Sequence, residues 1–468
     1  MGNANKFLKS SIIYFIGSVL TKGISFFLLP LYTNLISKAD MGYYDLTVSY
    51  LNIIFPVICM EVWSGIMRFM YDSSEKEGKY RAVFNGLLLF TCSMLLYSLL
   101  FIGLGFFSDI RYLFLIYLFG LLTMIQNFYS YLVRGLGYST VFAVSGLIGS
   151  LVNAGSNIIM ILCLGMRLDS LYIAMILGLL VQIIIMECKV RLLKNISFKM
   201  FDKSILKGLA KFSLPLSLNS ACFWFLSGYN RIGISNILGY EANGVYSVAA
   251  KFAFIISLVS SCFTMAWQEL AYSKGNDADK GELYTAASNY YLQFLAVGLL
   301  LFLPAINVVF PFFIGPEFRS AFDFIPLYLL GTAASIFSSF LGNIFGAEKK
   351  TNIIFFSTVA AAAVNVGLFH LLVGNMGLQA ANISLLCGFL VNIVMRLAFL
   401  NRSVRIRLNY WILAVTAVLF LAAWYVYLNF GALLNILFAI AVVFAAAFHF
   451  RSFLKMGWNT ISKKLKKQ

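Results

Sequence analysis

Long apolar runs recur along the whole chain, and short polar or charged segments separate them. Each run holds about 20 residues, enough for a helix to cross a hydrocarbon core of about 30 Å. The pattern predicts an all-α polytopic membrane protein with about 14 transmembrane helices. The predicted spans are residues 11–33, 44–68, 83–107, 110–133, 140–164, 170–190, 212–236, 244–268, 288–315, 321–345, 352–374, 377–400, 409–428 and 431–450.

The composition supports a membrane protein. Of the 468 residues, 61% are hydrophobic and only 11% are charged, whereas about 25% of a soluble globular chain is charged. The seven cysteines stand singly within the predicted spans, and we interpret them as small buried hydrophobic residues. His370 and His449 lie on different predicted helices, so we predict no metal site. The chain has no nucleotide-binding loop of the G-x-x-x-x-G-K-[ST] type, and no cofactor is predicted.

The basic residues are distributed unequally between the two sides of the predicted membrane. If the connections alternate, 28 Lys and Arg residues fall on the side of the two termini, counting Arg68, Lys189 and Arg396 near the inner ends of their spans. Only Lys38, Arg111, Arg167 and Arg319 fall on the other side. This is the positive-inside pattern, so we expect both termini in the cytoplasm. The formal net charge of +17 then sets orientation and meets anionic headgroups, and no nucleic-acid partner is predicted.

One long inner connection, residues 191–211, divides the chain. Its apolar residues alternate with lysines at roughly helical spacing, which predicts a basic amphipathic helix on the inner leaflet. The expected organisation is an N-terminal lobe of six spans (1–190), this cytoplasmic linker (191–211), a C-terminal lobe of six spans (212–400), and a two-helix hairpin with a basic cytoplasmic tail (401–468).

An internal repeat supports the two lobes. A shift of 202 positions sets residues 34–57 on residues 236–259 with six identities, among them Gly42 on Gly244. Because each unit holds an even number of spans, the two lobes should have the same orientation. We therefore expect a pseudo-twofold axis along the membrane normal and a cavity between the lobes.

Four short motifs follow one another in a fixed order. Residues 29–44 read LPLYTNLISKADMGYY, residues 134–137 read RGLG, residues 346–351 read GAEKKT, and residues 374–381 read GNMGLQAA. In this order and spacing, the motifs resemble the turns of bacterial polysaccharide flippases. These are the Wzx-type lipid-linked oligosaccharide transporters of the multidrug/oligosaccharidyl-lipid/polysaccharide exporter (MOP) superfamily. The resemblance covers most of residues 10–400.

The resemblance implies both a fold and a function. The fold would be two six-helix lobes that form a V and work by alternating access. The function would be to translocate undecaprenyl-pyrophosphate-linked oligosaccharide repeat units from the inner to the outer leaflet of the bacterial inner membrane. The product would be a capsule, an exopolysaccharide or an O-antigen. The implied partners are the lipid-linked oligosaccharide, membrane lipids, and a polysaccharide polymerase with its chain-length regulator.

Four ionisable residues lie away from the ends of the spans that would line the cleft of this fold. Lys22 lies near the middle of the first span. Arg231 and Lys251 lie roughly 10 Å and 8 Å from the middle of their spans toward the outer face, and Glu61 lies a similar distance toward the inner face. Because charges at membrane depth are costly, we predict that these three cations and one acid face a cavity of net positive charge, which binds an anionic pyrophosphate headgroup. Two structural alternatives stay open: Lys22 and Glu61 neutralise each other, or Arg231 and Lys251 extend to the outer surface.

The seventh span also carries side chains suited to sugars. The predicted sugar contacts, which combine amide donors with aromatic faces, are Asn219, Trp224, Tyr229 and Asn230. Asp45 is interpreted as a wetted residue at a helix end. Pro56 and Pro215 either kink the gating helices or are tolerated structural breaks.

Three other functions fit parts of the sequence. A multidrug or cation antiporter of the same fold usually needs a carboxylate in the first helix, where this chain has Lys22. A peptidoglycan-precursor flippase would share the fold and the number of spans. A membrane glycan polymerase needs an outer catalytic loop, and the outer connections here are short, so we predict no enzymatic activity.

Overall fold

The computed structural model describes residues 23–449, except residues 25, 74, 274–279, 349 and 403. Within this part of the chain the regular elements are all helices, and no strand occurs. The helices are α2 (Leu29–Leu35), α3 (Lys38–Cys59), α4 (Val62–Met70), α5 (Lys76–Phe107), α6 (Leu113–Gly135), α7 (Ser139–Leu162), α8 (Leu168–Val190), α9 (Leu192–Asn195), η1 (Phe198–Met200), α10 (Lys203–Ser227), α11 (Tyr229–Ile237), α12 (Tyr240–Ser273), α13 (Lys280–Phe313), η2 (Pro316–Phe324), α14 (Ile325–Ala347), α15 (Thr351–Met376), α16 (Gln379–Asn401), α17 (Tyr410–Asn429) and α18 (Ala432–His449).

These helices confirm the predicted all-α membrane fold. In the described residues, ten helices are long and apolar enough to cross a membrane, and α3 with α4, bent by 51° at their break, would be an eleventh. Each predicted span from residue 44 onward coincides with a helix or with a pair of consecutive helices. The first predicted span lies mostly outside the described residues, and only α2 covers its end. The count of 14 spans therefore stays a prediction.

The linker differs from the predicted single helix. Residues 191–211 form α9, η1 and the first turns of α10. The Ser197 side chain accepts from the backbone N–H of Lys199, and the Asp202 side chain caps the start of α10. Two capping residues so close together stop and restart the helix. The spacing of apolar residues in the segment cannot show where a side chain caps a helix, so these breaks were not predicted.

Contacts divide the chain into two compact units. Unit 1 comprises residues up to 247 with residues 316–318 and 358–385, and unit 2 comprises residues 248–315, 319–357 and 386 onward. Helices α12, α15 and α16 contribute residues to both units. These limits differ from those of the predicted lobes, which remain a prediction.

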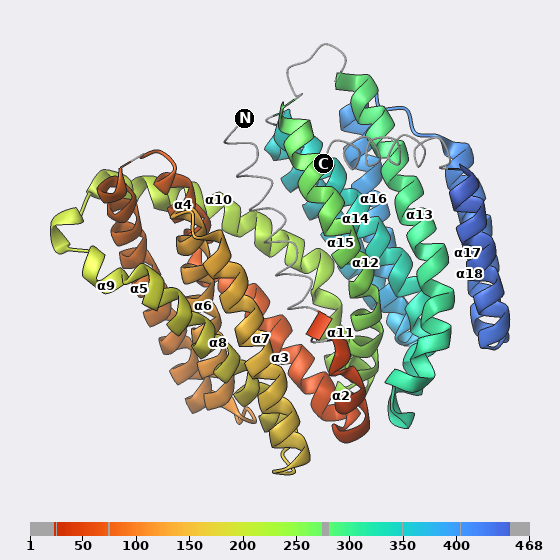
Figure 1. Ribbon diagram of the computed structural model, residues 1–468, viewed down its shortest axis with the longest axis horizontal. Helices are drawn as coiled ribbons and strands as arrows, with labels where there is room; N and C mark the ends of the chain where they lie inside the picture. The colour runs from red at the N-terminus through yellow and green to blue at the C-terminus, as the bar shows by residue number, and fades with distance from the viewer. Residues whose placement is uncertain are drawn as a thin grey trace, which may run out of the picture. The chain divides into compact units, whose positions relative to one another are not determined.

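In unit 1, helices α5 to α8 form a bundle (Figure 1). Helices α3 and α4 contact both this bundle and α10. The helices run back and forth, so that α4, α6 and α8 end, and α5, α7 and α10 begin, at the same end of the unit. We call this the basic end, because its connections carry most of the Lys and Arg residues of unit 1.

Helix α3 crosses the start of α12 at a pair of glycines. A methyl group on Gly42 would overlap the carbonyl oxygen of Tyr240, and one on Gly244 would overlap the carbonyl oxygen of Lys38. Tyr240 and Gly244 lie 202 positions after Lys38 and Gly42, which is the shift of the internal repeat. A contact that is reciprocal in this way is the signature of a twofold relation. The crossing thus supports the predicted pseudo-twofold axis at this point of unit 1.

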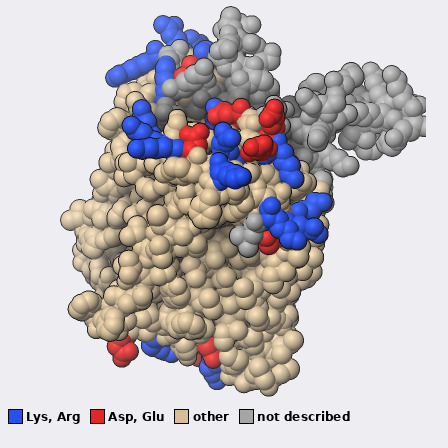
Figure 2. All heavy atoms as spheres, turned by 90° about the vertical axis from the view of Figure 1, so that its left-hand side faces the viewer, with Lys and Arg blue, Asp and Glu red and all other residues tan. Residues whose placement is uncertain are grey.

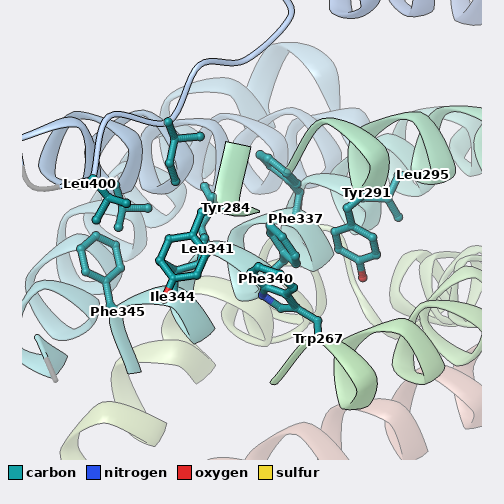
Figure 3. Packing of buried hydrophobic residues seen from close by; sticks show 12 residues of the cluster. Trp267, Tyr284, Tyr291, Leu295, Phe337, Phe340, Leu341, Ile344, Phe345 and Leu400 are labelled. Carbon is teal, nitrogen blue, oxygen red and sulfur yellow. The ribbon is translucent and has the colours of Figure 1, made fainter. Parts of the chain in front are cut away.

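Unit 2 is held together by an aromatic core. Trp267 stacks on Phe340 with ring centroids 4.7 Å apart, and the ring of Tyr291 lies 4.8 Å from the same phenyl ring. Figure 3 shows these rings together with aliphatic neighbours such as Leu341 and Leu400. The core joins α12, α13, α14 and α16, and each ring pair contributes about 0.5–1.5 kcal/mol beyond the burial of its area.

The surface shows where the hydrocarbon lies. On the face drawn in Figure 2, Lys and Arg side chains gather at the basic end, and a broad band without charged side chains separates them from a few charges at the other end. Helix α5 exposes a row of large apolar side chains in its middle and later turns, including Leu95, Leu96, Leu99 and Ile102. Such a continuous apolar band is incompatible with water but suits lipid chains.

We predict that Gly42→Ala lowers the melting temperature of the detergent-purified protein. The added methyl group must displace the Tyr240 carbonyl, and overpacking of this kind costs about 1–3 kcal/mol. Gly155→Ala in α7 is the matched control, because nothing lies within 4 Å of a Cβ at that position and alanine favours a helix by roughly 0.5–1 kcal/mol. An unchanged melting temperature in Gly42→Ala would contradict the close crossing.

Candidate functional site

The candidate site of unit 1 is a seam where α3 and α4 pack against α10 and α11. We call it the α3–α10 seam. Four polar contacts join its two sides. They are Asp45 with Arg231, Ser49 with Trp224, Pro56 with Ser217, and Glu61 with Ser220.

The seam contains a break in the second span. Met60 and Glu61, between α3 and α4, both have left-handed backbones, with φ angles of 48° and 53°. Non-glycine residues in this conformation cost roughly 1–3 kcal/mol each and cluster at functional sites. Because α3 ends at Cys59, its last carbonyl groups lack helical donors. The Ser217 hydroxyl donates to one of them, the carbonyl of Pro56, at 2.6 Å.

The Glu61 carboxylate is held by neutral donors. Ser220 Oγ donates to one carboxylate oxygen at 3.0 Å, and Trp63 Nε1 donates to the other at 2.8 Å. Glu61 is half-buried, and no Lys or Arg of the described residues forms an ion pair with it. Lys22, its predicted neutralising partner, lies outside the described residues. That alternative therefore remains open.

Arg231 forms an ion pair that the sequence analysis did not predict. Its Nε lies 2.7 Å from Asp45 Oδ2, and the two side chains are 24% and 21% exposed. The break after Ser227 starts a new helix, α11, whose first turn contacts α3 and brings Arg231 to Asp45. The interpretation of Asp45 as a wetted helix-end residue therefore omitted its partner. The pair also neutralises one of the three cations expected to face the cleft.

The four predicted sugar contacts differ in their surroundings. Trp224 is buried, and its Nε1 donates to the carbonyl of Ser49 at 3.0 Å. Asn230 is 2% exposed, and its amide donates to the carbonyl of Ala381 at 2.8 Å and exchanges hydrogen bonds with Asn365. Both side chains thus connect helices within unit 1.

The other two predicted contacts are more accessible. Tyr229 is half-buried, and its hydroxyl lies 2.7 Å from Nε2 of His370, which is exposed. Asn219 is also half-buried, and no side chain in the described ranges hydrogen-bonds to its amide. These two residues therefore keep polar surface that a ligand could reach.

The remaining predicted site residue belongs to the second unit. Lys251 is half-buried on α12, in unit 2. The structure thus brings Glu61, Trp224 and Arg231 together in one seam of unit 1, whereas Lys251 belongs to unit 2. Residues 23–449, apart from the gaps given above, contain no group of three His, Cys, Asp or Glu side chains that could hold a metal ion.

The serines of the seam were not predicted as site residues from the sequence. Ser213, Ser217, Ser220 and Trp224 follow one another at the spacing i, i+4, i+7 and i+11, so they share one face of α10. This polar stripe was the available signal. It did not show which helix the face would meet, because that depends on the packing of segments about 160 residues apart.

The architecture is shared with known transporters. Over 95% of this chain and 100% of the other, the structure resembles the lipid II flippase MurJ in an inward closed conformation, with a TM-score of 0.68 and 15% identity. An inward-facing multidrug resistance MATE family transporter of the MOP superfamily gives a TM-score of 0.62 at 17% identity, over 87% of this chain and 95% of that one. A MATE transporter of Vibrio cholerae gives 0.54 at 14% identity, over 86% and 97%. The protein is therefore a multi-pass membrane protein with a MATE/MurJ-like fold.

The sequence assigns the family. A family model described as "Polysaccharide biosynthesis protein" matches residues 7–267, which is more than half of the chain. The chain belongs to this polysaccharide biosynthesis protein family. No curated protein sequence matches it. The fold is the one expected from the resemblance to Wzx-type flippases of the MOP superfamily, and the family match agrees with that expectation.

We predict that the Asp45–Arg231 pair stabilises the seam. Arg231→Asp alone leaves two acids side by side and should cost about 1–3 kcal/mol, between the values typical of exposed and buried pairs. The double variant Asp45→Arg/Arg231→Asp should recover most of the loss, as measured by the melting temperature. The exposed pair Arg68–Asp72 is the control, and reversing its charges should change little. Additive losses in the double variant would refute the pairing.

A second prediction separates packing residues from accessible ones. Asn230→Leu removes a buried amide that joins α11 to α15 and α16, so it should lower the melting temperature markedly, since unsatisfied buried partners cost about 1–3 kcal/mol each. Asn219→Leu should leave the melting temperature close to that of the wild type. Equal losses in the two variants would show that the Asn230 contacts do not hold these helices together.

Proposed function

We propose that the protein is a flippase for undecaprenyl-pyrophosphate-linked oligosaccharide repeat units. It would move them from the inner to the outer leaflet of the bacterial cell membrane for capsule, exopolysaccharide or O-antigen assembly. One observation carries the proposal. The broken span α3/α4 bears Asp45 and Glu61, and Arg231 of α11 pairs with Asp45, in a chain of the polysaccharide biosynthesis family. Charges on broken membrane helices mark substrate and ion pathways.

The chemistry of the substrate matches these residues. A pyrophosphate is anionic, and a guanidinium binds such oxygens bidentately. Arg231 would exchange Asp45 for the pyrophosphate when substrate binds, with Lys22 and Lys251 as further point charges. Asn219 and Tyr229 are half-buried on the α10–α11 side of the seam, and their amide and phenol groups would bind sugar hydroxyls. Trp224 and Asn230 would hold the helices that carry them.

The direction of transport follows from the proposed orientation. With both termini in the cytoplasm, the basic end of unit 1 faces the inner leaflet, where the repeat unit is loaded. The lobes formed by residues 1–190 and 212–400 would rock about the pseudo-twofold axis, while the polyprenyl chain stays in lipid. An ion gradient or the membrane potential would drive the cycle. A polysaccharide polymerase and a chain-length regulator would receive the product.

A peptidoglycan-precursor flippase is the second candidate. The observation in its favour is the TM-score of 0.68 to the lipid II flippase MurJ, against 0.62 to the MATE transporter. The family match over residues 7–267 favours polysaccharide repeat units instead. A cation exporter is disfavoured, because the first predicted span has Lys22 where such exporters usually have a carboxylate.

Complementation tests the proposal. The gene would be expressed in a bacterial strain that lacks its repeat-unit flippase, together with the variants Lys22→Ala, Arg231→Ala and Lys251→Ala. Wild type should restore surface polysaccharide. The charge variants should leave the lipid-linked repeat unit trapped inside, with surface polysaccharide reduced at least roughly tenfold, since losing one charge-assisted contact of about 1.5–3 kcal/mol is worth that factor.

Two controls make the outcome decisive. Arg68→Ala removes an exposed cation and should export normally at matched membrane levels. A second host, depleted of its lipid II flippase, separates the two candidate substrates. Rescue of that host alone would show that the substrate is the peptidoglycan precursor. Full export by all three variants would show that these residues do not belong to the binding site.

A further inference from the structure

The linker segment 191–211 carries basic side chains without internal counterions. Lys194, Lys199, Lys203, Lys207 and Lys211 are all exposed, and in the described part of the chain none of the five forms an ion pair. The one acid of the segment, Asp202, accepts from the backbone N–H groups of Ser204 and Ile205. Lysines at positions 203, 207 and 211 stand four residues apart on α10 and repel one another. An external anion would relieve this repulsion.

Large aromatic side chains lie among these lysines. Phe198 is 85% exposed and Phe201 is 54% exposed. The ring of Phe198 contacts the ring of Phe84 on α5, with centroids 5.7 Å apart. Phe84 stands near the start of the part of α5 that follows Arg81, which carries no charged residue and where the hydrocarbon region begins. The two exposed rings thus lie at the depth of the membrane interface, which aromatic side chains favour.

A buried asparagine fixes the segment at this depth. Asn85 on α5 is fully buried. Its amide donates to the carbonyl of Met200 at 2.9 Å, and its amide oxygen accepts from the backbone N–H of Asp202 at 2.9 Å. The backbone around Phe201 is therefore bound from both sides, so the exposure of the two rings is a fixed property of the fold.

We propose that residues 194–211 form a binding surface for anionic phospholipid headgroups of the leaflet at the basic end. Phe198 and Phe201 insert among the first acyl carbons, and the five lysines contact the phosphates around them. Charge and aromatic side chains together favour a lipid over the other candidates. A second copy of the surface would bring like charges together, and a soluble polyanion would leave both rings in water. This surface is distinct from the α3–α10 seam and does not depend on the proposed transport function.

Tryptophan fluorescence in defined lipid tests the proposal. Phe198→Trp would be reconstituted without any lipid-linked oligosaccharide into bilayers of phosphatidylcholine or phosphatidylglycerol with brominated acyl chains. The emission of the wild type, with its six native tryptophans, is subtracted. We expect the added tryptophan to be quenched in both lipids. In mixtures, brominated phosphatidylglycerol should quench it more strongly than its mole fraction predicts.

A charge variant and its control complete the test. In the background of Phe198→Trp, the changes Lys194→Gln, Lys199→Gln and Lys203→Gln together should lower the relative association constant for phosphatidylglycerol at least roughly fivefold, the effect of one interfacial lysine. Lys76→Gln is the control, because Lys76 is exposed at the same end beside Glu75 and Glu77, and it should leave the constant unchanged.

Two results would overturn the proposal. Absence of quenching in either lipid would show that position 198 does not reach the bilayer. In mixtures, quenching in proportion to the mole fraction of each lipid, unaffected by the lysine changes, would show that the ring lies in the interface but that the lysines form no anion site. Neither result bears on complementation of the flippase-deficient strain, so the two proposals fail separately.

Discussion

The hydrocarbon core supplies no hydrogen bonds, so each backbone group at a helix break must find its partner within the protein. This constraint explains the α3–α10 seam. The second span stops at Cys59 and resumes at Val62, which frees carbonyl groups at membrane depth, and Ser217 supplies a donor to one of them. The same break turns Glu61 into a left-handed conformation, where Ser220 and Trp63 donate to its carboxylate. One irregular turn therefore fixes both the contact between two distant spans and the position of an acid.

The charged side chains of the α3–α10 seam each have a partner within unit 1. Arg231 is paired with Asp45, and Glu61 is held by hydroxyl and indole donors. A carrier must release its substrate as well as bind it, and a cation that exchanges between an internal carboxylate and an external phosphate can do both. By contrast, the linker lysines have no such internal partner among the described residues, which suits a surface in permanent contact with lipid.

Most of the fold could be predicted from the sequence, because hydrocarbon thickness imposes one length on all the spans. The helices from residue 44 onward fall where the apolar runs lie, and the Gly42–Gly244 repeat marked a real crossing. The site was harder to predict. A charge at membrane depth could be recognised for Arg231, but its partner Asp45 could not, since the pairing depends on a break after Ser227 that apolar periodicity does not reveal. Likewise, Asn230 resembled a ligand contact, and only its neighbours Asn365 and Ala381 show it as a connection between helices.

The reciprocal glycine crossing has a consequence for how the two halves of the chain can diverge. In a homodimer with this interface, a substitution at one position changes both sides of the contact at once. Here the two copies share one polypeptide, so each side can change alone. Positions 41 and 243 are equivalent under the 202-residue shift, yet one is Met and the other is Asn. Only Asn243 donates a side-chain hydrogen bond across the crossing, to the carbonyl of Gly42 at 2.8 Å. Within one polypeptide, an otherwise symmetric contact can therefore carry a hydrogen bond on one side only, while both glycines remain necessary for the close approach.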